Sequence, residues 1–366
     1  MPDTSSHADR STEGMVDYNA NSAVQRGIVD VHSATVRRLV ETIGRVRPQF
    51  RIADYGCGPG LSAITAVRPA IDAYRDLDPD GPIAVCHADQ PGNDWNALFA
   101  LVSGSDGYQP GGGNIRTEAA VGSFYDRMLD DASVDLATCY AASHWLSHAV
   151  HLEAPGAVWF ADLEGTARRE IEDLARSDWT RLLRLRAEEL RPGGYFLVST
   201  LAAVPDPAEK NGAAASGRHI YRAIQIVLQS MADDGLIDPG VLDRFVFALW
   251  FPTEADARDP IEADPVLRDA YSIEHVSVRP APINAEDVYA DAIDDPDLYA
   301  RLYTGYMRGF ADSSLHTQLF RPAARDDAHA DALAGEFYRR FETLYRDNPG
   351  TYRGELWELT AILRRR

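Results

Sequence analysis

Two short stretches of the sequence combine residue types that could bind a ligand and act on it. The first, Asp54-Tyr-Gly-Cys-Gly-Pro-Gly60, places an acid and three glycines directly after an apolar run. Glycine lets the backbone turn sharply and approach a ligand without a Cβ in the way. The second sets His144 beside Trp145, and each ring offers a planar N–H donor. Such donors could hold the oxygens of a carboxylate, although by position alone Trp145 is also compatible with a core anchor and His144 with a buried, hydrogen-bonded histidine.

The glycine stretch is predicted to join a buried strand, 52–55, to a helix over 61–73. A helix start offers unpaired N–H groups and a positive dipole end. Asp54 falls at the carboxyl end of the strand, where open α/β sheets bind ligands. An acid there suits an ammonium group or hydroxyls better than a pyrophosphate, which favours S-adenosylmethionine (SAM) over NAD. Two alternatives stay open: a turn that binds nothing, and a dinucleotide loop, although G-x-G-x-x-G would need glycine where the chain has Leu61.

The elements that must position these stretches alternate between helix and strand. Hydrophobic periodicity predicts helices over 24–43, 61–73, 93–102 and 167–190, with strands at 52–55, 82–88, 133–139 and 195–200. A loop over 108–114 and a short edge segment at 119–122 lie between them. The helix, Pro-Gly-Gly and strand around 190–195 form a connection typical of parallel sheets. We therefore predict an α/β fold with a Rossmann-like sheet.

The pattern changes after residue 204, where a proline-containing linker begins. Helices are predicted over 220–231, 242–249, 298–310 and 331–345, and strands at 271–278 and 357–363. The predicted organisation is a disordered terminus (1–14), a sheet core (15–204), a mostly helical cap (205–345, with a core strand near 271–278) and a last core strand (346–366).

Charge and composition exclude several classes of partner. The 366-residue chain carries a formal net charge of −20, so it repels phosphate backbones and nucleic acid is not an expected partner. No apolar run approaches the ~20 residues that span a membrane, and residues 1–14 contain no apolar signal region. The three cysteines lack zinc-site spacing, which favours reduced thiols in a cytoplasmic protein.

Several further segments follow one another in a fixed order. They are 17–25 (DYNANSAVQ), 54–60 (DYGCGPG), 89–99 (DQPGNDWNALF), 122–125 (GSFY), 143–147 (SHWLS) and 186–194 (RAEELRPGG). This series resembles the SABATH methyltransferases, which comprise carboxyl methyltransferases of salicylate, benzoate, jasmonate and indoleacetate and the caffeine-pathway N-methyltransferases. The resemblance covers roughly residues 17–200 and continues only in outline beyond them.

The resemblance implies SAM as the cofactor and assigns residues to it. Asp54 and Gly56 would line its methionine half, with Ser22 and Gln25 folding over it. Asp89 would accept the ribose hydroxyls, and Ser123 and Phe124 would hold the adenine. The remaining cofactor residues on this assignment are Tyr18, Ser62, Gln90, Cys139 and Tyr140. Taken alone, Asp89 is also compatible with a helix-capping residue and Phe124 with a core ring.

The same resemblance makes Gln25, His144 and Trp145 the catalytic carboxylate clamp. A carboxylic acid is already ionised near neutral pH, so methyl transfer by in-line displacement needs orientation and no general base. Ile220, Tyr221 and Trp250 are predicted to line a pocket for a small apolar acid of aromatic, indole or fatty type. A homodimer is also implied. The apolar run 245–251 is equally compatible with the cap's own core.

The sequence departs from the family pattern at three positions, and it also contains a possible metal site that would compete for His144. Gln90 replaces a leucine, Ser62 an asparagine and Ala141 a tyrosine. Some family members hold magnesium near the segment that corresponds to 243–254, and none is expected here. The spacing H-x3-H-x2-H-x-E over 144–153 would suit a metal site if it formed one helical face. The functional alternatives are N-methylation of a heterocycle, a non-catalytic SAM-binding protein and a nicotinamide oxidoreductase.

Overall fold

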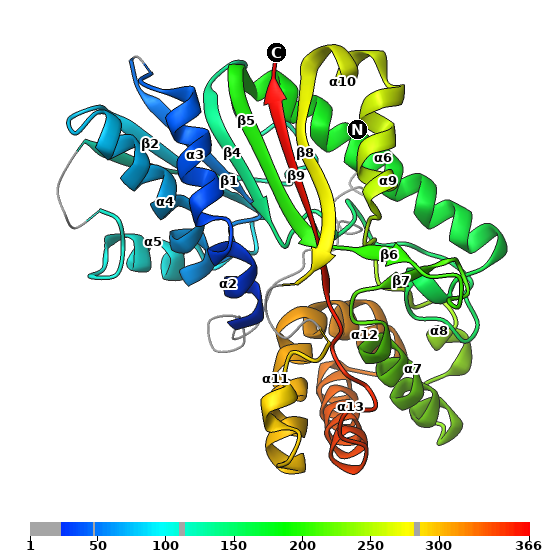
Figure 1. Cartoon of the computed structure of the whole chain (residues 1–366). Coiled ribbons are helices and arrows are strands. Elements are labelled where there is room, and N and C mark those ends of the chain that lie inside the picture. Colours follow the sequence, from blue (N-terminus) through cyan, green and yellow to red (C-terminus); the bar gives the residue numbers. More distant parts are fainter. Residues whose placement is uncertain (1–22, 47, 110–113, 282–285) are drawn as a thin grey trace, which may run out of the picture.

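A seven-stranded sheet forms the centre of the computed structural model, which describes residues 23–46, 48–109, 114–281 and 286–366. The strand order is β3-β2-β1-β4-β5-β9-β8 (Figure 1). The strands are β1 (Phe50–Tyr55), β2 (Ile83–Asp89), β3 (Ile115–Val121), β4 (Val134–Tyr140), β5 (Leu190–Leu201), β8 (Tyr271–Pro280) and β9 (Trp357–Arg365). From β3 to β5 neighbouring strands are parallel, and β9 lies antiparallel between β5 and β8. The predicted α/β class is confirmed.

Helices cover both faces of this sheet (Figure 1). On one face, α2 (Ala23–Asp30), α3 (Ser33–Ile43), α4 (Leu61–Leu77) and α5 (Trp95–Ser103) share an apolar core with the strands. On the other face, α6 (Gly165–Glu189), α9 (Glu254–Ala263) and α10 (Pro265–Ala270) form a second core. Successive strand residues point to opposite faces, so Ile52 belongs to the first core and Ala53 to the second.

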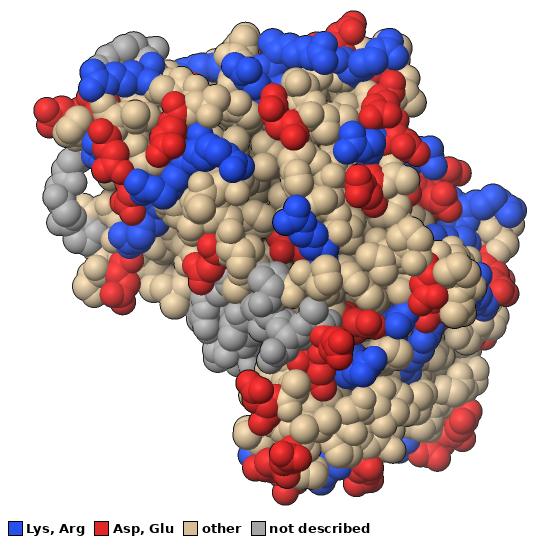
Figure 2. Space-filling model, viewed as in Figure 1, with Lys and Arg blue, Asp and Glu red and all other residues tan. Residues whose placement is uncertain are grey.

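A third apolar core fills a helical region beyond the carboxyl ends of the parallel strands (Figure 1). Its elements are α7 (Arg218–Asp233), α8 (Pro239–Leu242), α11 (Pro296–Ser314), a π-helix (Leu315–Phe320), α12 (Arg321–Ala323) and α13 (Asp327–Asp347). Short 3-10 helices lie at Phe160–Asp162 and Ala290–Ala292, and a two-stranded hairpin of β6 (Ala203–Pro205) and β7 (Ala213–Ala215) leads into α7. Figure 2 shows acidic and basic side chains interspersed on one face of the molecule. Among the described residues, no helix is both long and apolar enough to cross a bilayer.

Three predicted elements are wrong in detail. The helix expected over 24–43 is two helices, separated at Val31 and His32, because the His32 ring bonds to Glu358 on β9. The helix expected over 242–249 ends at Leu242. Residues 245–251 are buried, and the backbone groups of Phe247, Ala248 and Trp250 bond to the segment 144–158, which carries His144, rather than continuing a helix. The Pro-Gly-Gly connection is already part of β5, which begins at Leu190.

Candidate active site

The glycine turn closes tightly between β1 and α4. Gly56 and Gly58 have φ values of +73° and +63°, a region that favours glycine. A Cβ on Gly56 would lie 2.3 Å from the Cβ of Ala142. The turn therefore packs directly on the residues that follow β4, and only glycine fits at position 56.

Asp89, at the end of β2, is tied to this turn. Its carboxylate accepts hydrogen bonds from the backbone N–H of Gly58 and of Gln90, each at 2.7 Å. Burial raises the pKa of Asp89, and these two bonds oppose the shift. The cap of α5 is a different residue, Asp94, which accepts from Ala97 N at 2.9 Å. Asp89 is thus held at the turn and does not serve as a helix cap.

A cavity of about 1000 Å³, here called the cofactor cavity, opens beside this turn. Its lining residues are Gly56, Gly58, Pro59, Asp89, Gln90, Gly92, Asn93, Asp94, Ser123, Phe124, Tyr125, Tyr140, Ala141, Ala142, Trp145, Leu146 and Ser147. Six predicted cofactor residues are among them: Gly56, Asp89, Gln90, Ser123, Phe124 and Tyr140. No arginine or lysine from the described chain lines the cavity, so a diphosphate would meet no cationic side chain there.

The other predicted cofactor residues lie elsewhere. Asp54 is 2% exposed and accepts a hydrogen bond from Thr138 Oγ1 at 2.8 Å, behind the cavity wall. Ser62 is buried in the first turn of α4. Cys139 is buried on β4, and this burial raises the pKa of its thiol to about 12. Tyr18 and Ser22 lie outside the described residues. Gln25 belongs to α2, but its side chain is likewise outside the described part.

A second, smaller cavity of about 580 Å³, here called the acceptor cavity, lies next to the first. Its lining residues are Ile28, Ala141, His144, Trp145, Leu201, Ser216, Gly217, Ile220, Tyr221, Phe251, Tyr306, Phe310 and Leu356. Ala141 and Trp145 line both cavities, so ligands in the two would approach each other there. Apart from His144, no titratable side chain other than tyrosine lines it within the described chain.

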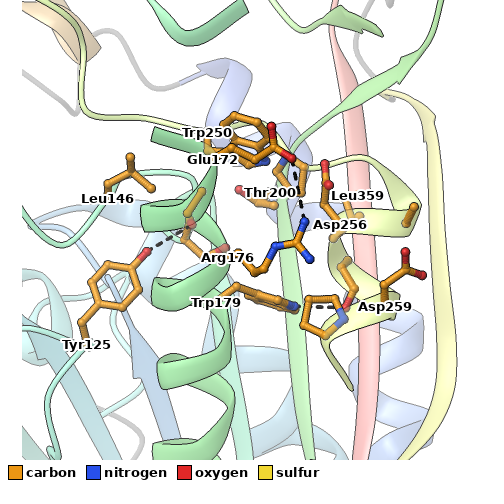
Figure 3. Close-up of a pocket in the computed structure, with 16 residues that line it drawn as sticks. Tyr125, Leu146, Glu172, Arg176, Trp179, Thr200, Trp250, Asp256, Asp259 and Leu359 are labelled. Atoms are coloured by element: carbon orange, nitrogen blue, oxygen red, sulfur yellow. Dashed lines mark hydrogen bonds and ion pairs between the residues drawn. The ribbon is translucent and has the colours of Figure 1, made fainter. Parts of the chain in front are cut away.

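Four of the six predicted acceptor residues line this cavity, Trp250 does not, and the side chain of Gln25 is outside the described part. His144, Trp145, Ile220 and Tyr221 are present, whereas the neighbour of Trp250, Phe251, takes the place expected for that indole. Trp250 instead lines a separate cavity of about 670 Å³ between α6 and α9, together with Trp179 and Thr200 (Figure 3). The guanidinium of Arg168 covers its ring at 4.3 Å.

His144 is held in one orientation by its surroundings. Its Nδ1 is hydrogen-bonded to Thr200 Oγ1 at 2.9 Å, and its backbone carbonyl accepts from Trp250 N at 2.8 Å. The edge of Phe251 meets the ring at a centroid distance of 5.4 Å. Burial lowers the pKa of His144 to about 3. The imidazole is therefore neutral near pH 7, and Nε2 is the nitrogen left for a ligand.

Ala141 carries the strained backbone of the site. It has a φ of +49°, which costs a non-glycine residue roughly 1 kcal/mol or more. Its N–H donates to the Ser199 carbonyl at 2.8 Å. The sequence marked this position only as a departure from the family pattern. No motif pointed to Thr200, which becomes part of the site only through a tertiary contact. Phe251 was indicated only as a member of the apolar run 245–251, which suited the pocket and the cap's own core equally.

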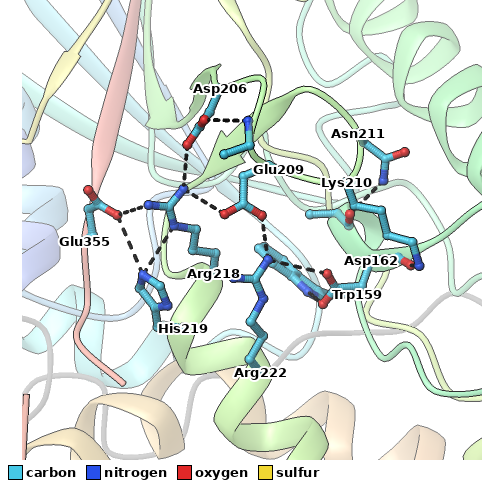
Figure 4. Close-up of polar contacts among 12 residues, drawn as sticks. Trp159, Asp162, Asp206, Glu209, Lys210, Asn211, Arg218, His219, Arg222 and Glu355 are labelled. Carbon is cyan, nitrogen blue, oxygen red and sulfur yellow. Dashed lines mark hydrogen bonds and ion pairs between the residues drawn. The ribbon is translucent and has the colours of Figure 1, made fainter. Parts of the chain in front are cut away.

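The wall of the acceptor cavity at the start of α7 is stabilised by a charged network (Figure 4). Arg218 pairs with Glu209 and Glu355, each at 3.0 Å, and with Asp206 at 3.3 Å. Arg222 pairs with the same Glu209 at 2.6 Å. These contacts attach the β6–β7 hairpin and the chain before β9 to the helix that presents Ile220 and Tyr221.

The rival metal site is not formed. Residues 143–159 form turns and irregular structure instead of the helix that the rival required. His144 is bonded to Thr200, and His148 Nδ1 to the hydroxyl of Ser147. Across the part of the chain that the structure describes, no three His, Cys, Asp or Glu side chains are grouped to hold a metal ion.

The fold and the two adjoining cavities define a class of enzyme. A glycine turn after β1, an acid at the end of β2 and a cavity beside them lie at the carboxyl ends of the parallel strands, where open α/β sheets bind their ligands. The family model of SAM-dependent carboxyl methyltransferases matches residues 5–331. The chain belongs to this family and uses SAM as its cofactor, as the sequence motifs predicted.

Known relatives and a solved structure agree with this assignment. Loganic acid O-methyltransferase of Catharanthus roseus is 24% identical over 73% of this chain and 74% of its own length. Jasmonate O-methyltransferase of Arabidopsis thaliana is 25% identical over 73% and 75%. A 3,7-dimethylxanthine N-methyltransferase of Camellia sinensis var. assamica is 25% identical over 72% and 74%. The structure of loganic acid methyltransferase with SAH superposes with a TM-score of 0.74 at 19% identity, covering 97% of this chain and 98% of that one.

Proposed function

We propose that this enzyme methylates the oxygen of a carboxylate on a small apolar acid of aromatic, indole or fatty type. One observation carries the proposal. The acceptor cavity offers the neutral ring donors of His144 and Trp145 next to the cofactor cavity, and its remaining walls are mostly apolar and aromatic. Such a cavity suits a ligand with one small anionic group and an apolar body.

The lining of the cofactor cavity supports this proposal, because it includes an acceptor carboxylate, a hydroxyl and an aromatic ring. Asp89 would accept the ribose hydroxyls, while Ser123 and Phe124 would hold the adenine. Gly56 lines the cavity and would contact the methionine half, because glycine lets the backbone approach a ligand closely. Ser22, Gln25 and Tyr18 also belong to the proposed set as the family motifs assign them, whereas Asp54 would act from behind the cavity wall, where it is bonded to Thr138. The bound cofactor supplies an electrophilic methyl group.

The residues of the acceptor cavity would act by orientation. When the Thr200 hydroxyl donates to Nδ1 of His144, the neutral ring carries its proton on Nε2. In this tautomer Nε2 would donate to one carboxylate oxygen, while the Trp145 indole and Gln25 would hold the other. A carboxylic acid with a pKa near 4 is already ionised. Neutral donors hold the carboxylate without a counter-charge, which avoids binding the ground state more strongly than the transition state.

N-methylation is the second candidate, because xanthine N-methyltransferases are among the relatives. A heterocyclic N–H must lose its proton for this reaction, which calls for a base. With a pKa lowered to about 3 by burial, His144 is a poor base at neutral pH. The electrostatics of the cavity therefore favour an acceptor that arrives already ionised.

Methyl transfer from labelled SAM tests the proposal. The acceptor panel is benzoate, salicylate, indoleacetate and medium-chain fatty acids, with xanthines as controls. We expect label in a base-labile ester of at least one acid. Label that appears only in a base-stable xanthine product would establish N-methylation instead.

Homodimerisation stays a prediction, which sedimentation of the purified protein would test.

A further inference from the structure

A buried polar cluster lies beside the two cavities, and the proposed reaction does not use it. His32 Nε2 and Ser199 Oγ both lie 2.5 Å from the same carboxylate oxygen, Oε1 of Glu358. The three residues are 8%, 0% and 6% exposed, respectively. We call His32, Ser199 and Glu358 the latch. Hydrogen bonds to a charged group are roughly twice as strong as neutral ones. The two hydrogen bonds to the Glu358 carboxylate are therefore expected to hold the three residues together strongly.

The latch joins three parts of the chain that are far apart in the sequence. His32 lies in the break between α2 and α3, Ser199 on β5 and Glu358 on β9. The Ser199 carbonyl also accepts from the N–H of Ala141, which lines both cavities. The next residue, Thr200, bonds to His144. Since adjacent strand residues face opposite ways, β5 supports the latch on one side and the acceptor histidine on the other.

The helix that the latch anchors forms part of the acceptor cavity. Ile28 on α2 lines that cavity, one helical turn before His32. With eight residues, α2 is too short to be stable by itself, so its position depends on tertiary contacts. Val29 packs against the core shared with α4, and the latch is the polar contact at the end of the helix.

We propose that His32 is a positioning residue, which holds α2 over the acceptor cavity through Glu358 and Ser199. Without the latch, α2 would occupy the cavity-forming position only part of the time. The apparent affinity for the acceptor falls in proportion to that fraction. At saturating acceptor concentration, binding shifts α2 fully into the cavity-forming position. Loss of the latch should therefore raise the acceptor KM and leave kcat nearly unchanged.

A matched pair of variants tests this role in the full-length enzyme. In His32→Gln the amide can still donate to Glu358, whereas in His32→Leu a side chain of similar size cannot. We expect His32→Leu to raise the acceptor KM about tenfold with kcat within twofold of wild type, and His32→Gln to stay within about threefold on both. His329 on α13 lines neither cavity. The control variant His329→Leu should therefore keep wild-type kinetics.

A second measurement does not depend on turnover, since the kinetic test rests on the proposed function. Hydrogen exchange of backbone amides 23–30, with S-adenosylhomocysteine bound, should be about tenfold faster in His32→Leu and unchanged in α4. If no acid is methylated, the proposed function fails, but the exchange result still shows whether the latch holds α2 in place.

Two outcomes would overturn the latch: wild-type KM and wild-type exchange of α2 in His32→Leu, or a fall in Tm and kcat together at constant KM. Should His32→Leu not fold, Glu358→Gln, which keeps the shape and removes the charge, must raise KM and α2 exchange.

Discussion

Thr200 and His144 are hydrogen-bonded to each other at 2.9 Å, although 56 residues separate them in the chain. The bond occupies Nδ1 of the imidazole and so determines which nitrogen faces the acceptor. Because the ring is buried and neutral, its contribution to the reaction is directional hydrogen bonding rather than charge.

Thr200→Val should lower kcat/KM for the acceptor about tenfold, because it removes a hydrogen bond worth about 1–1.5 kcal/mol and releases the ring. SAM affinity should not change. Thr200→Ser, which keeps the hydroxyl, should recover most of the activity. Steady-state kinetics with a titration of SAM check this, and equal kcat/KM in the Val and Ser variants would contradict it.

Trp145→Ala should reduce acceptor turnover much more than SAM binding. The indole lines both cavities, but its N–H is proposed to hold only the acceptor. Trp145→Phe keeps an aromatic wall and removes the donor, so it separates packing from hydrogen bonding. Unchanged turnover in both variants, at wild-type SAM affinity, would remove Trp145 from the carboxylate clamp.

Asp89→Ala should weaken SAM binding by about 1.5–3 kcal/mol, the range for hydrogen bonds that involve a charged group. The carboxylate also accepts from two backbone N–H groups of the turn, so Asp89→Asn should be affected as well. Isothermal titration with SAM measures the loss. An affinity equal to that of wild type would exclude Asp89 from the cofactor site.

Gly56→Ala should abolish SAM binding and destabilise the fold by roughly 3 kcal/mol or more. Its φ is +73° and a Cβ there would meet Ala142 at 2.3 Å. Gly44→Ala is the matched control, since Gly44 has the same φ with nothing within 4 Å. Because its ψ of −160° lies outside the left-handed helical region, that variant should lose roughly 1–3 kcal/mol and keep its SAM affinity. Equal unfolding free energies for the two variants would contradict the packing argument.

Acid should destabilise the enzyme partly through His144. Burial lowers the folded pKa from 6.5 to about 3, so below pH 6.5 the unfolded chain binds a proton that the folded one does not. The free energy of unfolding then falls by about 1.4 kcal/mol per pH unit between roughly pH 6.5 and 3 from this group. Denaturant unfolding from pH 7 to 4 should show a shallower slope for His144→Gln; parallel slopes would exclude the effect.

The sequence predicted those features of the site that depend on residues close together in the chain. The glycine turn was identified from residue types and spacing, whereas the roles of the acid at the end of β2 and of the His144–Trp145 pair were implied by the family resemblance. The alternation of helices and strands was predicted as well, because apolar periodicity records which face of an element is buried. Within the described chain, most of the predicted helices and strands are present, whereas α9, α10 and the β6–β7 hairpin were not predicted.

Tertiary contacts decided what periodicity could not. The break at His32 follows from a bond to Glu358 more than 300 residues away. The segment after Leu242 is almost entirely buried, and an apolar run without a polar face has no period to reveal its conformation. Its irregular path brings Phe251, rather than Trp250, into the acceptor cavity. Thr200 and Ala141 gain their roles for the same reason: the sequence specifies each residue, but only the packed sheet places them beside His144 and between the two cavities.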